Sequence, residues 1–170
     1  MSQLNRRSIV LGAIGAAAIG TARAQTLGTP SGRVILTISG NIGLRNAGET
    51  AAFDREMLEA LGMTSITTAT PWHQGRVTFE GVPMARLLAH VQARGEMLSV
   101  VALNDYTTEI PIADFARFGV ILAVKRDGEY MPVRDRGPLF IIYPYDSNPE
   151  LQSRLYYSRS AWQVARMTVR

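Results

Sequence analysis

Short runs of alternating or continuous apolar residues dominate the chain after residue 32. Residues 33–40 (RVILTISG) alternate apolar and polar positions, which predicts a strand buried on one face. Asp127-Gly128 is a strong turn signal and predicts a hairpin that joins residues 120–125 to residues 130–133. Further strands are predicted where apolar and β-branched residues gather, at residues 64–70, 76–79, 97–103, 139–143 and 162–169.

Fewer segments have helical spacing. In residues 83–94 one apolar stripe falls at i, i+3, i+4 and i+7, with Pro83 in the first turn and Gly95 after the end. Helices are also predicted at residues 53–61 and 113–118 and, less clearly, at 149–157, whereas residues 41–52 have loop composition. Because many short strands are mixed with few helices, the pattern predicts a single α+β domain with mixed β-sheets.

Residues 1–24 have the pattern of an export signal. Arg6 and Arg7 supply positive charge, residues 9–20 are modestly apolar, and Ala22-Arg23-Ala24 matches a small-residue cleavage site. We therefore expect a signal peptide over residues 1–24, a linker over 25–32 and a periplasmic domain over 33–170. The paired arginines fit the twin-arginine and the ordinary secretory routes equally. A retained anchor helix is the alternative, although the apolar stretch is shorter than the roughly 20 residues that a membrane span needs.

Charge and cysteine content narrow the function classes. The net charge is +4, and the predicted cleavage removes three arginines and no acidic residue, which leaves +1. This balance gives no support to nucleic-acid binding. The chain contains no cysteine, so neither a disulfide nor a thiolate metal site is expected. His73 and His90 have no partner at metal-site spacing, so a zinc site is not expected either.

Four short segments occur in an informative order. They are residues 79–83 (FEGVP) with Leu87-Leu88 after them, residues 100–106, residues 120–124 with residues 126–129 after them, and residues 136–139 (RGPL). Together they resemble the molybdopterin-binding domain of the sulfite-oxidase family, over about residues 34–170. The resemblance implies a sulfite-oxidase-like molybdopterin-binding fold with a cleft for a pterin.

One feature of that family is missing from the chain. Its enzymes place a cysteine before the F-x-G-V segment, and the cysteine thiolate binds molybdenum. Here residues 64–72 (TSITTATPW) contain no sulfur, and Thr68 and Thr70 stand where the cysteine is expected. A hydroxyl is a poor substitute, because a soft metal centre favours a soft ligand. The resemblance therefore implies the pterin cleft without its usual metal ligand.

A smaller branch of the family is similar in further segments. They are residues 102–106 (ALNDY), 135–139 (DRGPL) and 142–146 (IYPYD), with Trp162-Gln163. This branch implies a periplasmic sensor that binds a reduced pterin, has no catalytic cofactor, and signals to a membrane-bound cyclic-di-GMP enzyme or sensor kinase. Two alternatives stay open. One is a molybdopterin-cofactor oxidoreductase or a subunit of one, and the other is a scaffold that binds only protein partners.

The edges and faces of a pterin ring select candidate ligand-binding residues. A carboxylate accepts both the ring amine and the adjacent N–H, for which Asp105 is the first candidate and Asp146 the second. The other candidates are aromatic rings, guanidinium donors and polar pocket residues: Trp72, Tyr106, Tyr143, Tyr145, Arg134, Arg136, Thr70 and Asn104. The alternatives are a turn for Asp105, core positions for the aromatic residues and a solvated charge cluster for the arginines. Trp162 is expected in the core and His73 on the surface.

Overall fold

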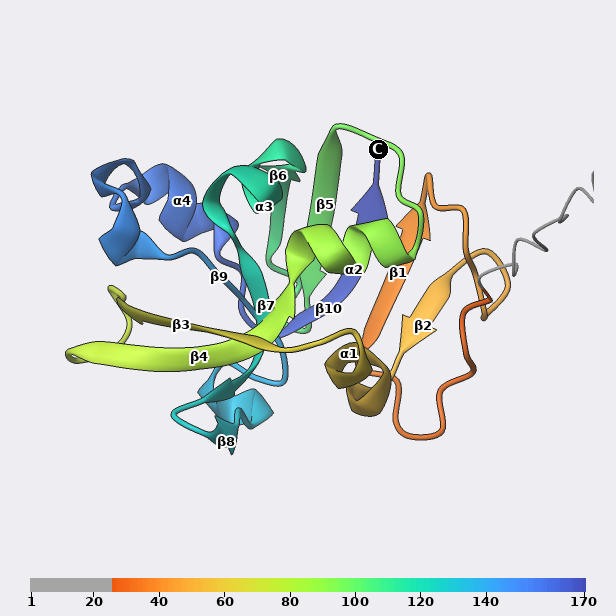
Figure 1. Ribbon diagram of the computed structural model, residues 1–170, viewed down its shortest axis with the longest axis horizontal. Coiled ribbons are helices and arrows are strands. Elements are labelled where there is room, and N and C mark those ends of the chain that lie inside the picture. Colours follow the sequence, from red (N-terminus) through yellow and green to blue (C-terminus); the bar gives the residue numbers. More distant parts are fainter. Residues whose placement is uncertain (1–25) are drawn as a thin grey trace, which may run out of the picture.

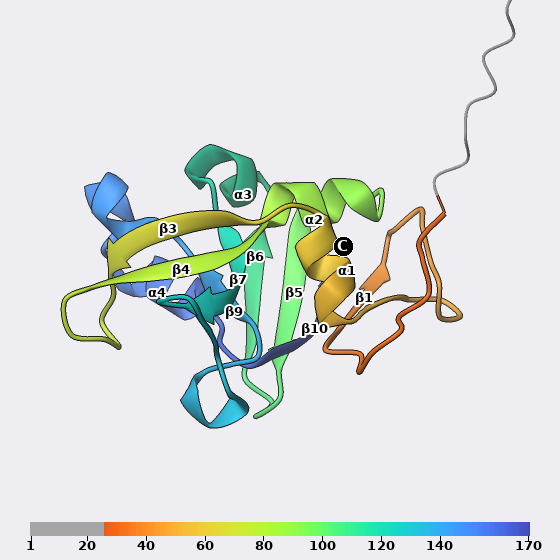
Figure 2. The ribbon, with the colours of Figure 1, turned by 60° about the horizontal axis from the view of Figure 1, so that its bottom comes forward.

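Two five-stranded sheets organise residues 26–170, the part of the chain that the computed structural model describes (Figures 1 and 2). The strand order in the first sheet is β2 (Ala51–Phe53), β1 (Leu36–Gly40), β10 (Val164–Val169), β5 (Met97–Ala102) and β6 (Thr107–Pro111). β1 and β10 run parallel, and the other neighbouring pairs of this sheet run antiparallel. The first and last strands of the described chain therefore lie side by side.

The second sheet holds the long β3–β4 hairpin. Its order is β3 (Thr64–Ala69), β4 (Arg76–Pro83), β7 (Ile121–Arg126) and β8 (Glu129–Tyr130), and β9 (Phe140–Ile142) also pairs with β7. Figure 1 shows the hairpin extending away from the first sheet. The register shifts at Gly81, where a Cβ atom would lie 2.1 Å from the Leu122 carbonyl oxygen. Glycine is therefore required where β4 crosses β7, which explains its place in the FEGVP segment.

Four short α-helices complete the domain: α1 (Arg55–Ala60), α2 (Met84–His90), α3 (Ala113–Phe118) and α4 (Arg154–Arg159). Three 3₁₀ turns lie in the connections, namely η1 (Val133–Asp135), η2 (Tyr145–Ser147) and η3 (Pro149–Leu151). Figures 1 and 2 show α2 and α3 over one face of the first sheet. The apolar stripe of α2 is buried there, with Met84, Leu87 and Leu88 in the main core.

The predicted class, α+β with mixed sheets and few helices, is confirmed, and the differences are local. α2 ends at His90 instead of residue 94, because Gln92 has a left-handed φ of 53° and the Val91 and Gln92 carbonyl groups accept from the Gly43 N–H. β2 begins in the segment that was expected to be a loop. Asp54 caps α1 by accepting from the Met57 N–H, so the helix begins at Arg55 instead of residue 53. β6 was not predicted.

The predicted signal peptide and the first residue of the predicted linker lie outside the described residues. Within residues 26–170, no helix is long and apolar enough to cross a membrane.

Candidate functional site

Trp72, in the loop between β3 and β4, is the centre of an aromatic cluster. Its ring centroid lies 5.4 Å from Phe140, 5.5 Å from Trp162, 5.9 Å from Tyr157 and 6.2 Å from Tyr145. All four neighbouring rings are tilted or edge-on, so none is stacked parallel to the indole. Trp72 itself stays half-buried, at the junction of the main core and a smaller second core. The cluster therefore holds the half-buried indole in a fixed orientation.

A chain of hydrogen bonds links the end of β3 to the loop after β8. The Thr70 hydroxyl lies 2.8 Å from His73 Nδ1, and Arg126 Nη1 lies 3.3 Å from His73 Nε2. Arg126 Nη2 donates to Asp135 Oδ2 at 2.6 Å, and Arg136 Nη1 donates to Asp135 Oδ1 at 3.4 Å. The hydrogen bond from Arg126 lowers the pKa of Asp135, and the same bond raises the pKa of Arg126. These five residues form one connected set, called here the polar network.

The polar network fixes the proton on His73. A guanidinium group only donates, so Nε2 accepts from Arg126 and the proton lies on Nδ1. Nδ1–H then donates to Thr70 Oγ1, which also accepts from the Trp72 backbone N–H at 3.3 Å. Burial, and then the charges of Arg136 and Arg126, lower the pKa of His73, which favours this neutral form. Both lone pairs of the Thr70 hydroxyl are used, so its hydrogen is left to donate to another acceptor.

The polar network and the aromatic cluster meet at Arg136. Its Cζ lies 5.8 Å from the centroid of Trp162, close enough for a cation–π contact. Gln163 holds the same loop, because its Nε2 donates to the Val133 carbonyl at 2.7 Å and its backbone N–H donates to the Arg136 carbonyl at 3.1 Å. Arg136 has a φ of 64°, so its backbone takes a left-handed conformation at this point. Trp162 is half-buried at this contact and is not confined to the core.

The turn between β5 and β6 carries three predicted residues, Asn104, Asp105 and Tyr106, all of them exposed. Asp105 has a φ of 62°, and Asn104 Oδ1 accepts from the Tyr106 N–H at 3.2 Å, so these residues also build the turn. The Tyr106 hydroxyl donates to the Ser158 carbonyl at 2.7 Å. Ser158 lies in α4, which also supplies Tyr157 to the aromatic cluster. The turn therefore contacts α4, the helix that supplies Tyr157 to the aromatic cluster.

Tyr143 and Tyr145 do not offer a face to a ligand, which corrects the expectation for both. They are 0% and 1% exposed. The Tyr143 hydroxyl donates to Asp114 Oδ2 at 3.0 Å, and the Tyr145 hydroxyl is hydrogen-bonded to Ser160. Burial raises the pKa of both hydroxyl groups, so they stay neutral. Tyr143 directly follows β9 and Tyr145 begins η2, and this segment places both rings in the core.

Thr68 and Asp146 are hydrogen-bonded to each other's segment at the position where the metal-binding cysteine is expected. Thr68 is 1% exposed, and its Oγ1 accepts from the Asp146 N–H at 3.1 Å. In return, Asp146 Oδ2 accepts from the Ala69 N–H at 3.0 Å and lies 3.4 Å from Arg76 Nε. Both side chains are therefore used to join η2 to the end of β3. Asp146 has a structural role that the sequence did not indicate.

These residues fit a flat heterocycle but do not fit ligation of molybdenum. The half-buried indole of Trp72, the guanidinium of Arg136 and the free hydrogen of Thr70 suit a planar ring with acceptors on its edge. No thiolate exists in the chain, and the Thr68 hydroxyl is already hydrogen-bonded. Within residues 26–170 no group of three His, Asp or Glu side chains could hold a metal ion. The described residues therefore supply no evident protein ligand for molybdenum.

The mixed sheets, the FEGVP crossing and the loops around Trp72 define a molybdopterin-binding fold of the sulfite-oxidase type. Residues 51–146 match the family described as the oxidoreductase molybdopterin binding domain. This match spans more than half of the chain, and the chain belongs to that family. A search of curated proteins finds no match.

The same fold occurs in a solved enzyme structure. The chain is similar to the sulfane dehydrogenase SoxCD from Paracoccus pantotrophus, with a TM-score of 0.57 and 18% sequence identity. The similarity covers 79% of this chain but only 37% of the SoxCD chain. At this identity the similarity shows a shared fold only, and the dehydrogenase activity in the name describes SoxCD.

The structure brings together three of the predicted residues, Trp72, Thr70 and Arg136. Arg134 is exposed, and its side chain makes no hydrogen bond or ion pair with any other described residue. Sequence reasoning missed the residues that connect the site, which are His73, Arg126, Asp135, Trp162 and Gln163. The Trp162-Gln163 pair and the 135–139 segment did carry a signal through the family resemblance, whereas nothing in the sequence joined His73 to Arg126.

Proposed function

We propose that this domain is a periplasmic binding protein for a reduced pterin. The observation that carries the proposal is the half-buried Trp72, which is hydrogen-bonded through its backbone to Thr70 and packs on Trp162, the ring that the Arg136 guanidinium contacts. A pterin ring stacks on the indole, and its O4 and N5 edge accepts from Arg136 and Thr70. Asp105 is the acceptor that we propose for the ring amine, because its carboxylate is exposed and makes no ion pair with any residue in 26–170.

The proposed role is signalling instead of redox catalysis. The site lacks a metal ligand, and a binding protein needs only a ligand-dependent change at its surface. We propose that the bound state is read by the periplasmic part of a membrane-bound cyclic-di-GMP enzyme or sensor kinase. The exposed turn with Asn104, Asp105 and Tyr106 contacts α4 through Tyr106, and we propose that a partner senses occupancy through this turn.

Calorimetric titration with 6-methyl-tetrahydropterin under anaerobic conditions tests the binding step. We expect one site on the folded protein. Trp72→Ala and Arg136→Gln should each weaken binding by about tenfold or more, because stacking and charged hydrogen bonds contribute about 1.5 kcal/mol each. Arg94→Gln changes an exposed arginine outside the site and serves as the matched control, with unchanged affinity. If correctly folded wild-type protein binds no reduced pterin, the proposal is wrong.

A molybdopterin-dependent oxidoreductase is the second candidate. The family match and the fold shared with a sulfane dehydrogenase favour it. Elemental analysis of the protein isolated from its native host separates the two functions. Stoichiometric molybdenum would support the enzyme, whereas a co-purified pterin without molybdenum, identified by mass spectrometry, would support the binding protein.

A further inference from the structure

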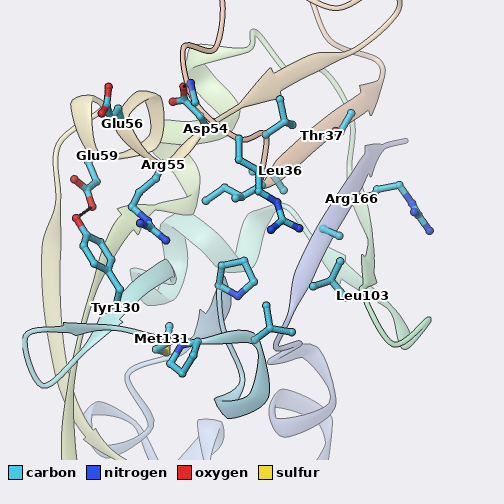
Figure 3. Close-up of a pocket in the computed structure, with 18 residues that line it drawn as sticks. Leu36, Thr37, Asp54, Arg55, Glu56, Glu59, Leu103, Tyr130, Met131 and Arg166 are labelled. Atoms are coloured by element: carbon cyan, nitrogen blue, oxygen red, sulfur yellow. Dashed lines mark hydrogen bonds between the residues drawn. The ribbon is translucent and has the colours of Figure 1, made fainter.

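A cavity of about 880 Å³ lies apart from the residues of the polar network and the aromatic cluster. It is bounded by the start of β1, the first turns of α1, β8 and the loop after it, and the beginning of β10 (Figure 3). The parallel pairing of β1 with β10 begins only at Thr37 and Arg166, so the chain segments before these residues are free to separate. The volume of the cavity is in the range of sites for small organic ligands.

Exposed apolar side chains gather at this cavity. Among residues 26–170, six large apolar side chains are exposed, and four of them line the cavity. These four are Val34, Leu103, Tyr130 and Val133, at 44%, 53%, 43% and 49% exposure. Scattered single apolar residues are normal on a surface, but a concave group of them is typical of a binding site.

Arg55 gives the cavity a positively charged anchor. Its Cζ lies 4.1 Å from the centroid of the Tyr130 ring, and Figure 3 shows its side chain reaching from α1 toward that ring. The Tyr130 hydroxyl donates to Glu59 Oε1 at 2.8 Å, which holds the ring in place. No carboxylate among the described residues lies within 4 Å of the Arg55 guanidinium. A stacked guanidinium keeps its N–H edge available, and that edge matches a planar or tetrahedral oxyanion.

The acidic residues at the rim are occupied by the protein. Asp54 accepts from the backbone N–H groups of Ser31, Gly32 and Met57, and these bonds lower its pKa. Glu59 accepts from Tyr130, and the side chain of Glu56 points away from the cavity in Figure 3. The carboxylates are therefore held at the α1 side, whereas the three arginines that line the cavity, Arg33, Arg55 and Arg166, form no ion pair within residues 26–170.

We propose that this cavity binds a small amphipathic organic anion. The anionic group lies on the guanidinium of Arg55, and the apolar body lies against Val34, Leu103 and Val133. This site is separate from the proposed pterin site, because none of Trp72, His73 and Arg136 lines the cavity. It therefore does not depend on the pterin hypothesis.

Two fluorescent probes that share one ring system test the proposal. 8-Anilinonaphthalene-1-sulfonate carries a sulfonate, and N-phenyl-1-naphthylamine is its uncharged counterpart. We expect one sulfonate probe per protein, and Arg55→Gln should weaken its binding by about tenfold, as the loss of a charged hydrogen bond does. The same substitution should change binding of the neutral probe less than about twofold. Leu103→Asn should weaken both probes, and Arg94→Gln should weaken neither.

Further variants and a competition experiment locate the binding site and keep the test decisive if Arg55→Gln does not fold. Arg55→Lys keeps the charge and loses the planar fork, so it should retain part of the sulfonate affinity if Arg55→Gln proves unstable. Trp72→Ala should leave the sulfonate probe bound, and 6-methyl-tetrahydropterin should not displace it. Equal loss of both probes in Arg55→Gln, no loss of either, absence of stoichiometric binding to wild type, or displacement by the pterin would each overturn the proposal.

Discussion

The guanidinium of Arg126 can only donate hydrogen bonds, and this fixes which groups of the polar network donate and which accept. Because Arg126 can only donate to His73, the imidazole accepts at Nε2 and donates at Nδ1, and Thr70 accepts from it. The order of these bonds depends on His73 being neutral. A protonated His73 would face Arg126 as a second cation and would break the network at its middle.

The first prediction concerns the protonation of His73. Burial and the neighbouring guanidinium groups lower its pKa below the ordinary value of 6.5, so the folded protein binds this proton less readily than the unfolded chain. The contribution of neutral His73 to the free energy of unfolding is fully present above pH 6.5. It is lost as the pH falls from 6.5 toward the lowered pKa of the folded state. Nitrogen NMR should show the Nδ1–H form at pH 7 and a titration midpoint below 6.5.

His73→Asn provides the assignment and the control. The chain contains two histidines, so the signals that vanish in this variant belong to His73. The variant should also lose part of the acid sensitivity of the unfolding free energy. An Nε2–H form in the folded wild type would contradict the bond order of the polar network.

The sequence could indicate single residues of the site but not its connections. Trp72 and Arg136 are indicated because a pterin needs a ring face and donors, and Thr70 is indicated because it stands where the family's cysteine is expected. His73 and Arg126 are 53 positions apart and meet only because β4 pairs with β7, which places Arg126 opposite Phe79. The His73 ring packs 5.6 Å from Phe79. Such a contact follows from strand register, which no local pattern in this chain specifies.

At the scale of elements, one buried carboxylate joins three segments. Asp114 in α3 is 6% exposed and accepts from the Tyr143 hydroxyl after β9 and from Arg159 Nη1 of α4 at 2.8 Å. α4 supplies Tyr157 to the aromatic cluster, so the ion pair between Asp114 and Arg159 holds in place a helix that contributes to the site. Removing the carboxylate leaves a guanidinium and a phenol without their partner in a desolvated place.

We predict that Asp114→Ala lowers the free energy of unfolding by about 3 kcal/mol, as the loss of one partner of a buried pair does. Urea denaturation followed by circular dichroism measures the change. Glu109→Ala is the matched control, because Glu109 and Arg170 also form an ion pair at 3.0 Å but are 53% and 64% exposed. The control should lose less than about 1 kcal/mol. Equal losses in the two variants would show that Asp114 is not a structural anchor.

Element types followed from the sequence where the pattern was long or strong. α3 has the predicted bounds, and β3 and β5 each differ from prediction by one residue at the C-terminal end. β2 has three residues, all buried, so it shows no alternation. β6 is an edge strand, with exposed residues at its start and Pro111 at its end. These two strands exist because β1 and β5 offer them backbone partners, and that is a tertiary effect.

At the scale of the whole molecule, one loop serves two surfaces. Asp135 and Arg136 belong to the polar network, whereas Met131, Pro132, Val133 and Pro138 line the cavity. The loop is held by Arg126 through Asp135 and by Gln163 through the Val133 carbonyl. Each ligand therefore meets a loop that is already fixed by the protein, which lowers the ordering cost of binding.

Ligand binding should accordingly appear as added stability of the entire domain. A reduced pterin that binds only the folded state adds about 2.7 kcal/mol to the free energy of unfolding at 100 times its dissociation constant. For a chain of 170 residues this corresponds to a rise of roughly 5–10 °C in the melting temperature. We predict this rise with 6-methyl-tetrahydropterin in a thermal unfolding experiment, and no comparable rise with the same concentration in Trp72→Ala.

Arg55→Gln should keep the full pterin-dependent rise, because Arg55 lines the cavity and takes no part in the polar network. A rise that persists in Trp72→Ala but disappears in Arg55→Gln would move the pterin from the loop around Trp72 to the cavity beside α1.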